Sequence, residues 1–205
     1  MTNEIFSTIL QILLFTLIPF LVYLISKRSV KEFFIYIGFK PTTHKAYSLG
    51  FLLSLLLALP ILALTLVNPE YKAIMIDPGS ISGAIRNTGF SGEAIATILI
   101  VAIFKTSLAE EILFRGFIAK RLINITNFQI GNIIQAVLFG ILHVFIFVSI
   151  SKSILLLTLI FLFPAAFAYF IVYLNEKVGD GSIIPGWIAH GSANFISYNV
   201  VAFLI

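Results

Sequence analysis

The chain has 205 residues and no cysteine, 60% of its residues are hydrophobic, only 11% are charged, and its mean hydropathy is +1.07. This composition lies far outside the range of soluble domains and indicates a polytopic membrane protein. The lack of cysteine excludes a disulfide scaffold, a thiolate nucleophile and thiolate metal ligands, so any catalysis must use carboxylates, histidines or hydroxyls. The net charge of +4 is modest, and the placement of the charges matters more than their sum.

Six segments are long and apolar enough to cross a bilayer core of roughly 30 Å, which takes about 20 helical residues. They cover residues 5–26, 46–67, 93–119, 128–149, 153–175 and 183–204. The fold class is therefore all-α: a bundle of about six transmembrane helices forming a single membrane-embedded domain over residues 1–205. An acid, Glu4, stands where a signal peptide has a basic region, so we expect the first span to remain in the mature protein.

The basic residues predict the orientation of the bundle. The ends of the odd-numbered connections carry Lys27, Arg28, Lys31, Lys40, Lys45, Arg115, Lys120, Arg121 and Lys177, whereas the other connections carry Lys72, Arg86 and Lys152. By the positive-inside rule the first group faces the cytoplasm, and both termini lie outside. Between the spans, we expect a short interfacial helix within residues 30–45, one long outside loop at 68–92, and a turn at 176–182.

Ionisable residues within the spans are functional candidates, because each costs about 2.5 to 3.5 kcal/mol on insertion scales. In the third span, Glu111 and Arg115 are spaced i,i+4 with the acid on the N-terminal side, the better orientation for an ion pair. Glu110 points about 100° away from Glu111 and has Phe114 four residues later, so we expect it to lack a counter-ion and to act as a general base or acid. The alternative is a purely structural cluster of both glutamates and Arg115.

Two later spans carry the other candidates. Phe139 and His143 lie one turn apart on the fourth span, and His190 and Asn194 lie one turn apart on the sixth. Taken singly, each is also typical of a structural hydrogen bond between membrane helices. Lys105 does not share a face with Glu110, and we find no acid within the spans to pair with it, so we expect a structural or snorkelling role for this lysine.

The depths of these groups predict that they meet. At about 1.5 Å per residue, Glu110 lies about 15 Å from Lys120, and His190 lies about 13 Å from Gly181. Both ends are cytoplasmic in the predicted topology, so the two groups share a level near mid-membrane. His143 lies about 22 Å from the start of its helix, several ångströms too deep unless that helix is tilted or begins later.

Three signatures now stand in order. They are Glu110 and Glu111 followed by Arg115, Phe139 followed by His143, and His190 followed by Asn194. This pattern resembles the CAAX-protease and bacteriocin-processing (CPBP) family of intramembrane endopeptidases, also called the Abi family, whose eukaryotic relatives trim prenylated CAAX termini. The resemblance covers roughly residues 93–200, and the first two spans carry no motif.

The resemblance implies peptide-bond hydrolysis inside a bacterial cytoplasmic membrane. Glu110 and His143 would activate a water, and His190 with Asn194 would bind the developing oxyanion. Glu111, Arg115 and Phe139 would support the site. Because two imidazoles and a carboxylate are also the ligand set of an open catalytic zinc site, Glu110, His143 and His190 form an alternative metal site. The absence of an HExxH motif leaves both versions open, so the cofactor is zinc or none.

Two other functions compete with proteolysis. A non-catalytic protein conferring immunity to a bacteriocin would use the same polar site to bind a peptide without cutting it. A proton-coupled or cation transporter would use Glu110 and the histidines as a relay, but no inverted halves are detectable in the sequence. We expect the bilayer and a peptide or protein substrate as partners, and no nucleic acid.

Overall fold

The computed structural model describes residues 1–205 and is helical throughout, without strands. Five helices are long and apolar enough to cross a membrane. They are α1 (Thr2–Lys27), α3 (His44–Val67), the continuous helix Gly92–Ile125, α8 (Phe128–Phe147) and the continuous helix Ile154–Val178, which comprises α9 (Ile154–Tyr173) and η3 (Leu174–Val178). A sixth long helix, α10 (Ile184–Phe203), ends the chain. The prediction of an all-α bundle of about six membrane helices is confirmed.

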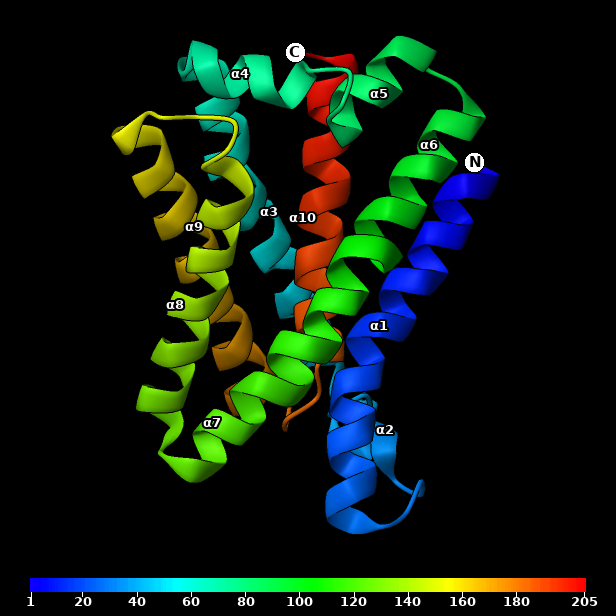
Figure 1. Ribbon diagram of the computed structural model, residues 1–205, viewed down its shortest axis with the longest axis vertical. Coiled ribbons are helices and arrows are strands. Elements are labelled where there is room, and N and C mark those ends of the chain that lie inside the picture. The colour runs from blue at the N-terminus through cyan, green and yellow to red at the C-terminus, as the bar shows by residue number, and fades with distance from the viewer.

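Helix α10 is less apolar than the others because protein surrounds it. Figure 1 shows it in the middle of the molecule, and residues along its length from Pro185 to Ala202 are buried. Its indole at Trp187 donates a hydrogen bond of 2.7 Å to the backbone carbonyl of Ile103 on the neighbouring helix. A helix in this position needs little contact with lipid, so it can carry polar residues that a lipid-facing helix could not.

The third membrane helix is longer and wider than the sequence predicts. It runs from α6 (Gly92–Leu99) through two π-helical stretches, η1 (Ile100–Leu108) and η2 (Glu111–Ala119), to α7 (Lys120–Ile125). A side-chain hydrogen bond spans the same five-residue interval as a π-helical turn. The hydroxyl of Ser107 donates to the carbonyl of Ala102, five residues earlier, at 2.6 Å. π-Helical turns are rare and frequent at functional sites, and this segment carries both glutamates.

The long connection predicted as a loop at 68–92 contains two short helices, α4 (Pro69–Ile76) and α5 (Ile81–Thr88). The residues that indicate a loop are helix caps here. The side chains of Asn68 and Ser80 accept hydrogen bonds from the backbone N–H groups of Tyr71 and Gly83, and Pro69 opens α4. Such residues favour helix starts as strongly as turns. The predicted interfacial helix is a single turn, α2 (Phe33–Tyr36).

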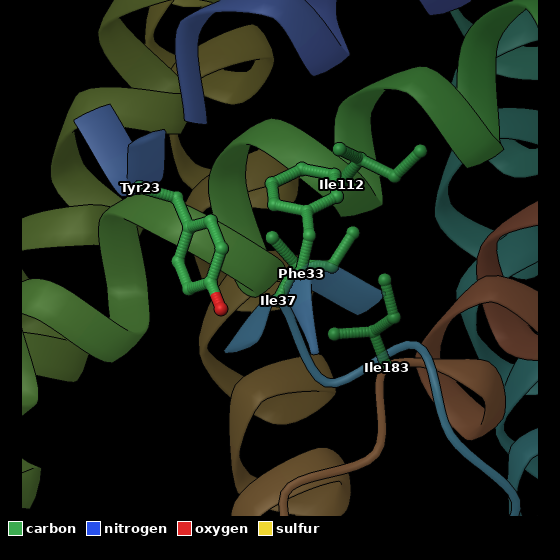
Figure 2. Close-up of a cluster of buried hydrophobic side chains, with 5 residues drawn as sticks. All are labelled: Tyr23, Phe33, Ile37, Ile112 and Ile183. Atoms are coloured by element: carbon green, nitrogen blue, oxygen red, sulfur yellow. The ribbon is translucent and has the colours of Figure 1, made fainter. Parts of the chain in front are cut away.

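A small hydrophobic cluster holds the bundle together at the end where α2 and α7 lie. It contains Tyr23, Phe33, Ile37, Ile112 and Ile183, all buried. Figure 2 shows these side chains grouped between α1, the α2 segment, the third membrane helix and the turn before α10. Because Ile112 directly follows the two glutamates and Ile183 directly precedes α10, this cluster fixes the two helices that form the centre of the site.

Two helix pairs are in close backbone contact. A Cβ atom added at Gly50 of α3 would lie 2.5 Å from the carbonyl oxygen of Pro185 at the start of α10, and one added at Gly140 of α8 would lie 2.7 Å from that of Phe161 on α9. Only glycine permits such approaches. A cavity of about 480 Å³ lies between the α3/α10 pair and the α8/α9 pair.

Candidate active site

Glu111 is fully buried and bridges two groups. Its Oε1 lies 3.3 Å from Nε of Arg115 and 3.2 Å from Nδ1 of His190. The predicted i,i+4 ion pair with Arg115 is therefore present, and the arginine is only 1% exposed. The N–H of this contact is not directed for a hydrogen bond, and the other guanidinium nitrogens have no hydrogen-bond partner. The carboxylate is thus the principal counter-charge of a buried arginine and a direct partner of His190.

Glu110 has a different environment from its neighbour. Its Oε2 lies 3.9 Å from Nε2 of His190, its side chain is 22% exposed, and it makes no hydrogen bond. The expected absence of a counter-ion on its own helix holds, but His190 of α10 stands opposite it. The two glutamates therefore face the two nitrogens of one imidazole, with Glu111 on Nδ1 and Glu110 on Nε2.

His143 has its ring orientation fixed by its own helix. Its Nδ1 lies 2.9 Å from the backbone carbonyl oxygen of Phe139. A carbonyl oxygen can only accept, so Nδ1 carries the proton and donates it. In the neutral imidazole, Nε2 then has a free lone pair, the form that accepts a proton or binds a metal.

The ring of Phe139 lies between the other groups. The guanidinium carbon of Arg115 lies 4.1 Å from the ring centroid, the imidazole of His143 lies 4.6 Å away and that of His190 lies 6.4 Å away. The structure therefore brings the third, fourth and sixth membrane helices together around one aromatic ring. A cation above an aromatic face is attracted by about 0.5 to 2 kcal/mol, which partly offsets the incomplete hydrogen bonding of Arg115.

Asn194 is held by two hydroxyls that sequence reasoning missed. Its Nδ2 donates to Oγ1 of Thr106 at 3.1 Å and to Oγ of Ser107 at 3.2 Å. Both hydroxyls donate their own hydrogens to backbone carbonyls, such as that of Ala102, so they can only accept from the amide. Both amide hydrogens are thus engaged, and binding an oxyanion with this group requires one of these bonds to be exchanged. Two hydroxyls one turn before a pair of membrane glutamates are a signal that the sequence did contain.

The cavity adjoins these groups. Phe139, His143, His190 and Asn194 line one part of it, and Glu110 is not among the lining residues. The remaining walls are mostly leucine, isoleucine, phenylalanine and proline from α3, α8 and α9. A mostly apolar chamber with a few convergent polar groups is the usual form of a small-ligand site.

Lys105 has an acidic partner that lies just outside the predicted spans. Its Nζ lies 2.8 Å from Oε2 of Glu4. The acid lies one residue before the predicted first span, but helix α1 already begins at Thr2, so the two side chains reach each other across α1 and η1. The lysine is thus part of a structural ion pair and does not belong to the site around His190.

The alternative metal site would use Glu110, His143 and His190. No group of three or more histidine, aspartate or glutamate side chains in the structure is arranged to hold a metal ion. The chemistry below is derived from the protein groups alone, and metal analysis of the purified protein tests the zinc alternative.

Comparisons with known proteins identify the family. A family model described as "Type II CAAX prenyl endopeptidase Rce1-like" matches residues 92–196. The matched segment contains all three signatures and the hydroxyl pair. Neither curated proteins nor solved structures gave a significant match. The resemblance indicated by the three signatures is confirmed.

Proposed function

The chain belongs to the type II CAAX prenyl endopeptidase Rce1-like family, and from this premise we propose that it is an intramembrane endopeptidase whose water is activated by Glu110 and His143. The observation that carries this proposal is the arrangement of the two glutamates around His190. One acid is enclosed and already paired with an arginine, and the other is partly exposed and free of hydrogen bonds. Only the second is available to take a proton from water.

The reaction needs one base and one donor. A water between Glu110 and the free Nε2 of His143 loses a proton to the carboxylate as its oxygen attacks the peptide carbonyl carbon. The tetrahedral intermediate collapses when the C–N bond breaks and the proton passes to the leaving nitrogen. The products are a carboxylate and an amine, and no cofactor is needed for the balance. General-base catalysis of this kind contributes about 10²- to 10⁴-fold.

His190 is suited to bind the oxyanion. With both nitrogens protonated it donates through Nδ1 to Glu111 and offers its Nε2 hydrogen to the site. Donors preorganised toward a developing oxyanion are worth about 10²- to 10³-fold each. Asn194 contributes a second hydrogen when it exchanges one hydroxyl partner.

The apolar chamber supports a substrate with a large hydrophobic group. Its rim includes Leu56 of α3 and Phe170 of α9, which are 64% and 54% exposed on the outside of the bundle. In a bilayer, these residues face hydrocarbon. We therefore propose that the substrate is a membrane-associated peptide or protein that reaches the site laterally between α3 and α9, and that its hydrophobic part, a prenyl group in the terms of the family, occupies the chamber.

Two substitutions test the hydrolytic role. Glu110→Gln keeps the shape of the side chain but cannot take a proton, and His143→Ala removes the second group on the water. We expect both to abolish the biological activity while membrane insertion stays intact. The measurement compares membrane and secreted peptides from cells carrying the native chain or Glu110→Gln by mass spectrometry. Full activity of either variant would rule out the hydrolytic role.

Binding without cleavage is the second candidate, because the same polar site and chamber can hold a peptide passively. An immunity function by binding alone should survive Glu110→Gln, which changes basicity and little else. Metal analysis of the purified protein accompanies this comparison. A stoichiometric metal that disappears in His143→Ala would revive the zinc alternative and require the site to rearrange on metal binding.

A further inference from the structure

We propose that Tyr71 of α4 forms the end wall of the chamber and sets the greatest length of the hydrophobic group that the site accepts. This proposal rests on the proposed function, because it assigns the chamber to the substrate. No motif singles out this tyrosine, and it lies outside the segment that matches the family, residues 92–196.

The chamber extends away from the reacting groups along α8. Phe139, His143 and Phe147 line it at successive turns, a distance of about 12 Å along the helix axis. The imidazole of His143 thus lies partway along, and the chamber continues for one more turn to Phe147. A hydrophobic group attached near the scissile bond would extend in that direction, toward the end of the bundle where α4 lies (Figure 1).

Tyr71 closes that end. Its ring stacks on that of Phe147 with centroids 6.4 Å apart and an interplanar angle of 23°. It is 7% exposed and belongs to a hydrophobic cluster with Leu64, Leu156 and Ile160. Leu64 and Ile160 also line the chamber, so the cluster spans the gap between α3 and α9. The ring therefore lies between α3, α8 and α9 at this end of the chamber.

The wall is firmly held. The side chain of Asn68 caps α4 and accepts a hydrogen bond of 2.8 Å from the backbone N–H of Tyr71. Glu70, one residue earlier, accepts a hydrogen bond from Ser151 in the connection between α8 and α9. Both sides of the chamber thus anchor the helix turn that carries the tyrosine. A fixed wall discriminates by length, whereas a mobile one would yield.

The chemistry of the wall suits a hydrocarbon end. Burial raises the pKa of the Tyr71 phenol to about 12, so the ring is uncharged at physiological pH, and its hydroxyl makes no hydrogen bond to the protein. No charged side chain lines the chamber at this end. The occupant that fits is therefore a single unbranched or isoprenoid chain, and its length is the property that the wall can sense.

The test uses peptides that carry thioether-linked groups of two, three or four isoprene units. Their cleavage by the reconstituted full-length protein gives a ratio of kcat/KM for the longest to the shortest chain. Tyr71→Leu makes the side chain of the end wall smaller and the chamber longer. It should raise this ratio at least tenfold, because a single methylene in a hydrophobic pocket is worth about 10- to 200-fold. Tyr71→Trp makes this side chain larger and the chamber shorter, and it should lower the kcat/KM ratio. Tyr173→Leu, which alters an exposed tyrosine of α9, is the matched control and should leave the ratio unchanged.

Two readouts separate the failures. Equal ratios in the native chain and both Tyr71 variants, with cleavage retained, would overturn the end-wall proposal and leave the proposed function standing. Absence of cleavage in the native chain would contradict the proposed function. In that case the binding of the same three peptides is measured with Glu110→Gln by competition against a photoreactive isoprenoid peptide. Affinities that shift with chain length in opposite directions for Tyr71→Leu and Tyr71→Trp would sustain the end wall, and unshifted affinities would overturn it.

Discussion

At the scale of single residues, the two adjacent glutamates have separate tasks because their surroundings differ. Glu111 is 0% exposed and bound to Arg115 and His190, whereas Glu110 is 22% exposed and touches only the far nitrogen of the imidazole. A buried charge must keep its partner. A partly exposed carboxylate can exchange protons with water. The burial of the neighbour thus decides which glutamate is free to react.

Glu111→Gln is expected to lower the free energy of unfolding while membrane insertion stays intact. It leaves the buried guanidinium of Arg115 without its counter-charge, a change that costs about 3 to 5 kcal/mol in comparable buried pairs. The measurement is unfolding in detergent with increasing denaturant. Glu4→Gln is the control, because it breaks the more exposed pair with Lys105 and should cost less than about 1 kcal/mol. Equal effects of the two variants would contradict this division.

Thr106 is expected to act as a positioning residue for Asn194. Thr106→Val keeps the volume but removes one of the two oxygens that hold the amide, so kcat should fall by about tenfold, equivalent to 1.4 kcal/mol, while KM changes little. Thr106→Ser restores the oxygen and should restore kcat. A higher kcat in Thr106→Val would mean that the hydroxyl restrains the amide instead of presenting it.

The sequence draws attention to some of the candidate side chains and not to others. Glu110, His143, His190 and Asn194 stand out because ionisable and amide side chains are rare in membrane helices. Thr106 and Ser107 escaped notice because hydroxyls in membrane helices usually bond to their own backbone, as these also do. Their second role depends on the position of α10, and only the tertiary structure provides it.

At the scale of helices, the site depends on how closely α3 approaches α10. The contact at Gly50 has no room for a side chain, because a Cβ atom would meet the backbone of Pro185 at 2.5 Å. The helix that carries His190 and Asn194 begins at this contact. The position of both residues relative to the third membrane helix is therefore set partly by a glycine that lies four membrane helices earlier in the sequence.

Gly50→Ala should destabilise the protein by about 1 to 3 kcal/mol, the usual cost of forcing extra volume into a packed contact. It should also lower activity, since α10 must shift. The matched control is Gly92→Ala, where an added Cβ meets nothing within 4 Å and the change should be neutral or stabilising by up to about 1 kcal/mol. Thermal unfolding of both variants in the same detergent checks this. An unaffected Gly50→Ala protein would show that the contact is not required.

The positions of the membrane helices along the chain were predictable, but their local geometry was not. Hydropathy predicts all six spans because about 20 apolar residues are needed to cross the bilayer. The π-helical stretches are invisible to a pattern based on 3.6 residues per turn. The 68–92 connection was misread because Asn68, Pro69 and Ser80 favour both turns and helix starts, and only packing decides between them.

At the scale of the whole molecule, the basic residues collect at one end. Lys120 donates to Glu176 at 2.6 Å and to the carbonyl of Gly181 at 2.7 Å, and the guanidinium of Arg121 lies 3.9 Å from the ring of Tyr36. These contacts tie α2, α7 and the turn before α10 together. Both termini lie at the opposite end (Figure 1). The positive-inside rule therefore predicts that the end with α2 and α7 is cytoplasmic.

The lack of cysteine makes this topology directly testable. Asn124→Cys at the end with α7 and Ser149→Cys in the connection between α8 and α9 each introduce a single exposed thiol. A membrane-impermeant maleimide applied to intact cells should label the Ser149→Cys protein, and it should label the Asn124→Cys protein only after the membrane is opened. The reverse pattern would mean that the end with α2 and α7 faces the outside. It would also exchange the two leaflets relative to the site.

The central claim is that Glu110 is the base of a hydrolytic reaction inside the bundle. The most direct measurement is cleavage of a prenylated peptide by the purified protein in liposomes made with ¹⁸O-water, with the products analysed by mass spectrometry. We predict that the native chain yields a fragment with ¹⁸O in its new carboxyl group, and that Glu110→Gln, folded and inserted alike, reduces the yield by at least about 10². Equal yields from the two proteins would contradict the account.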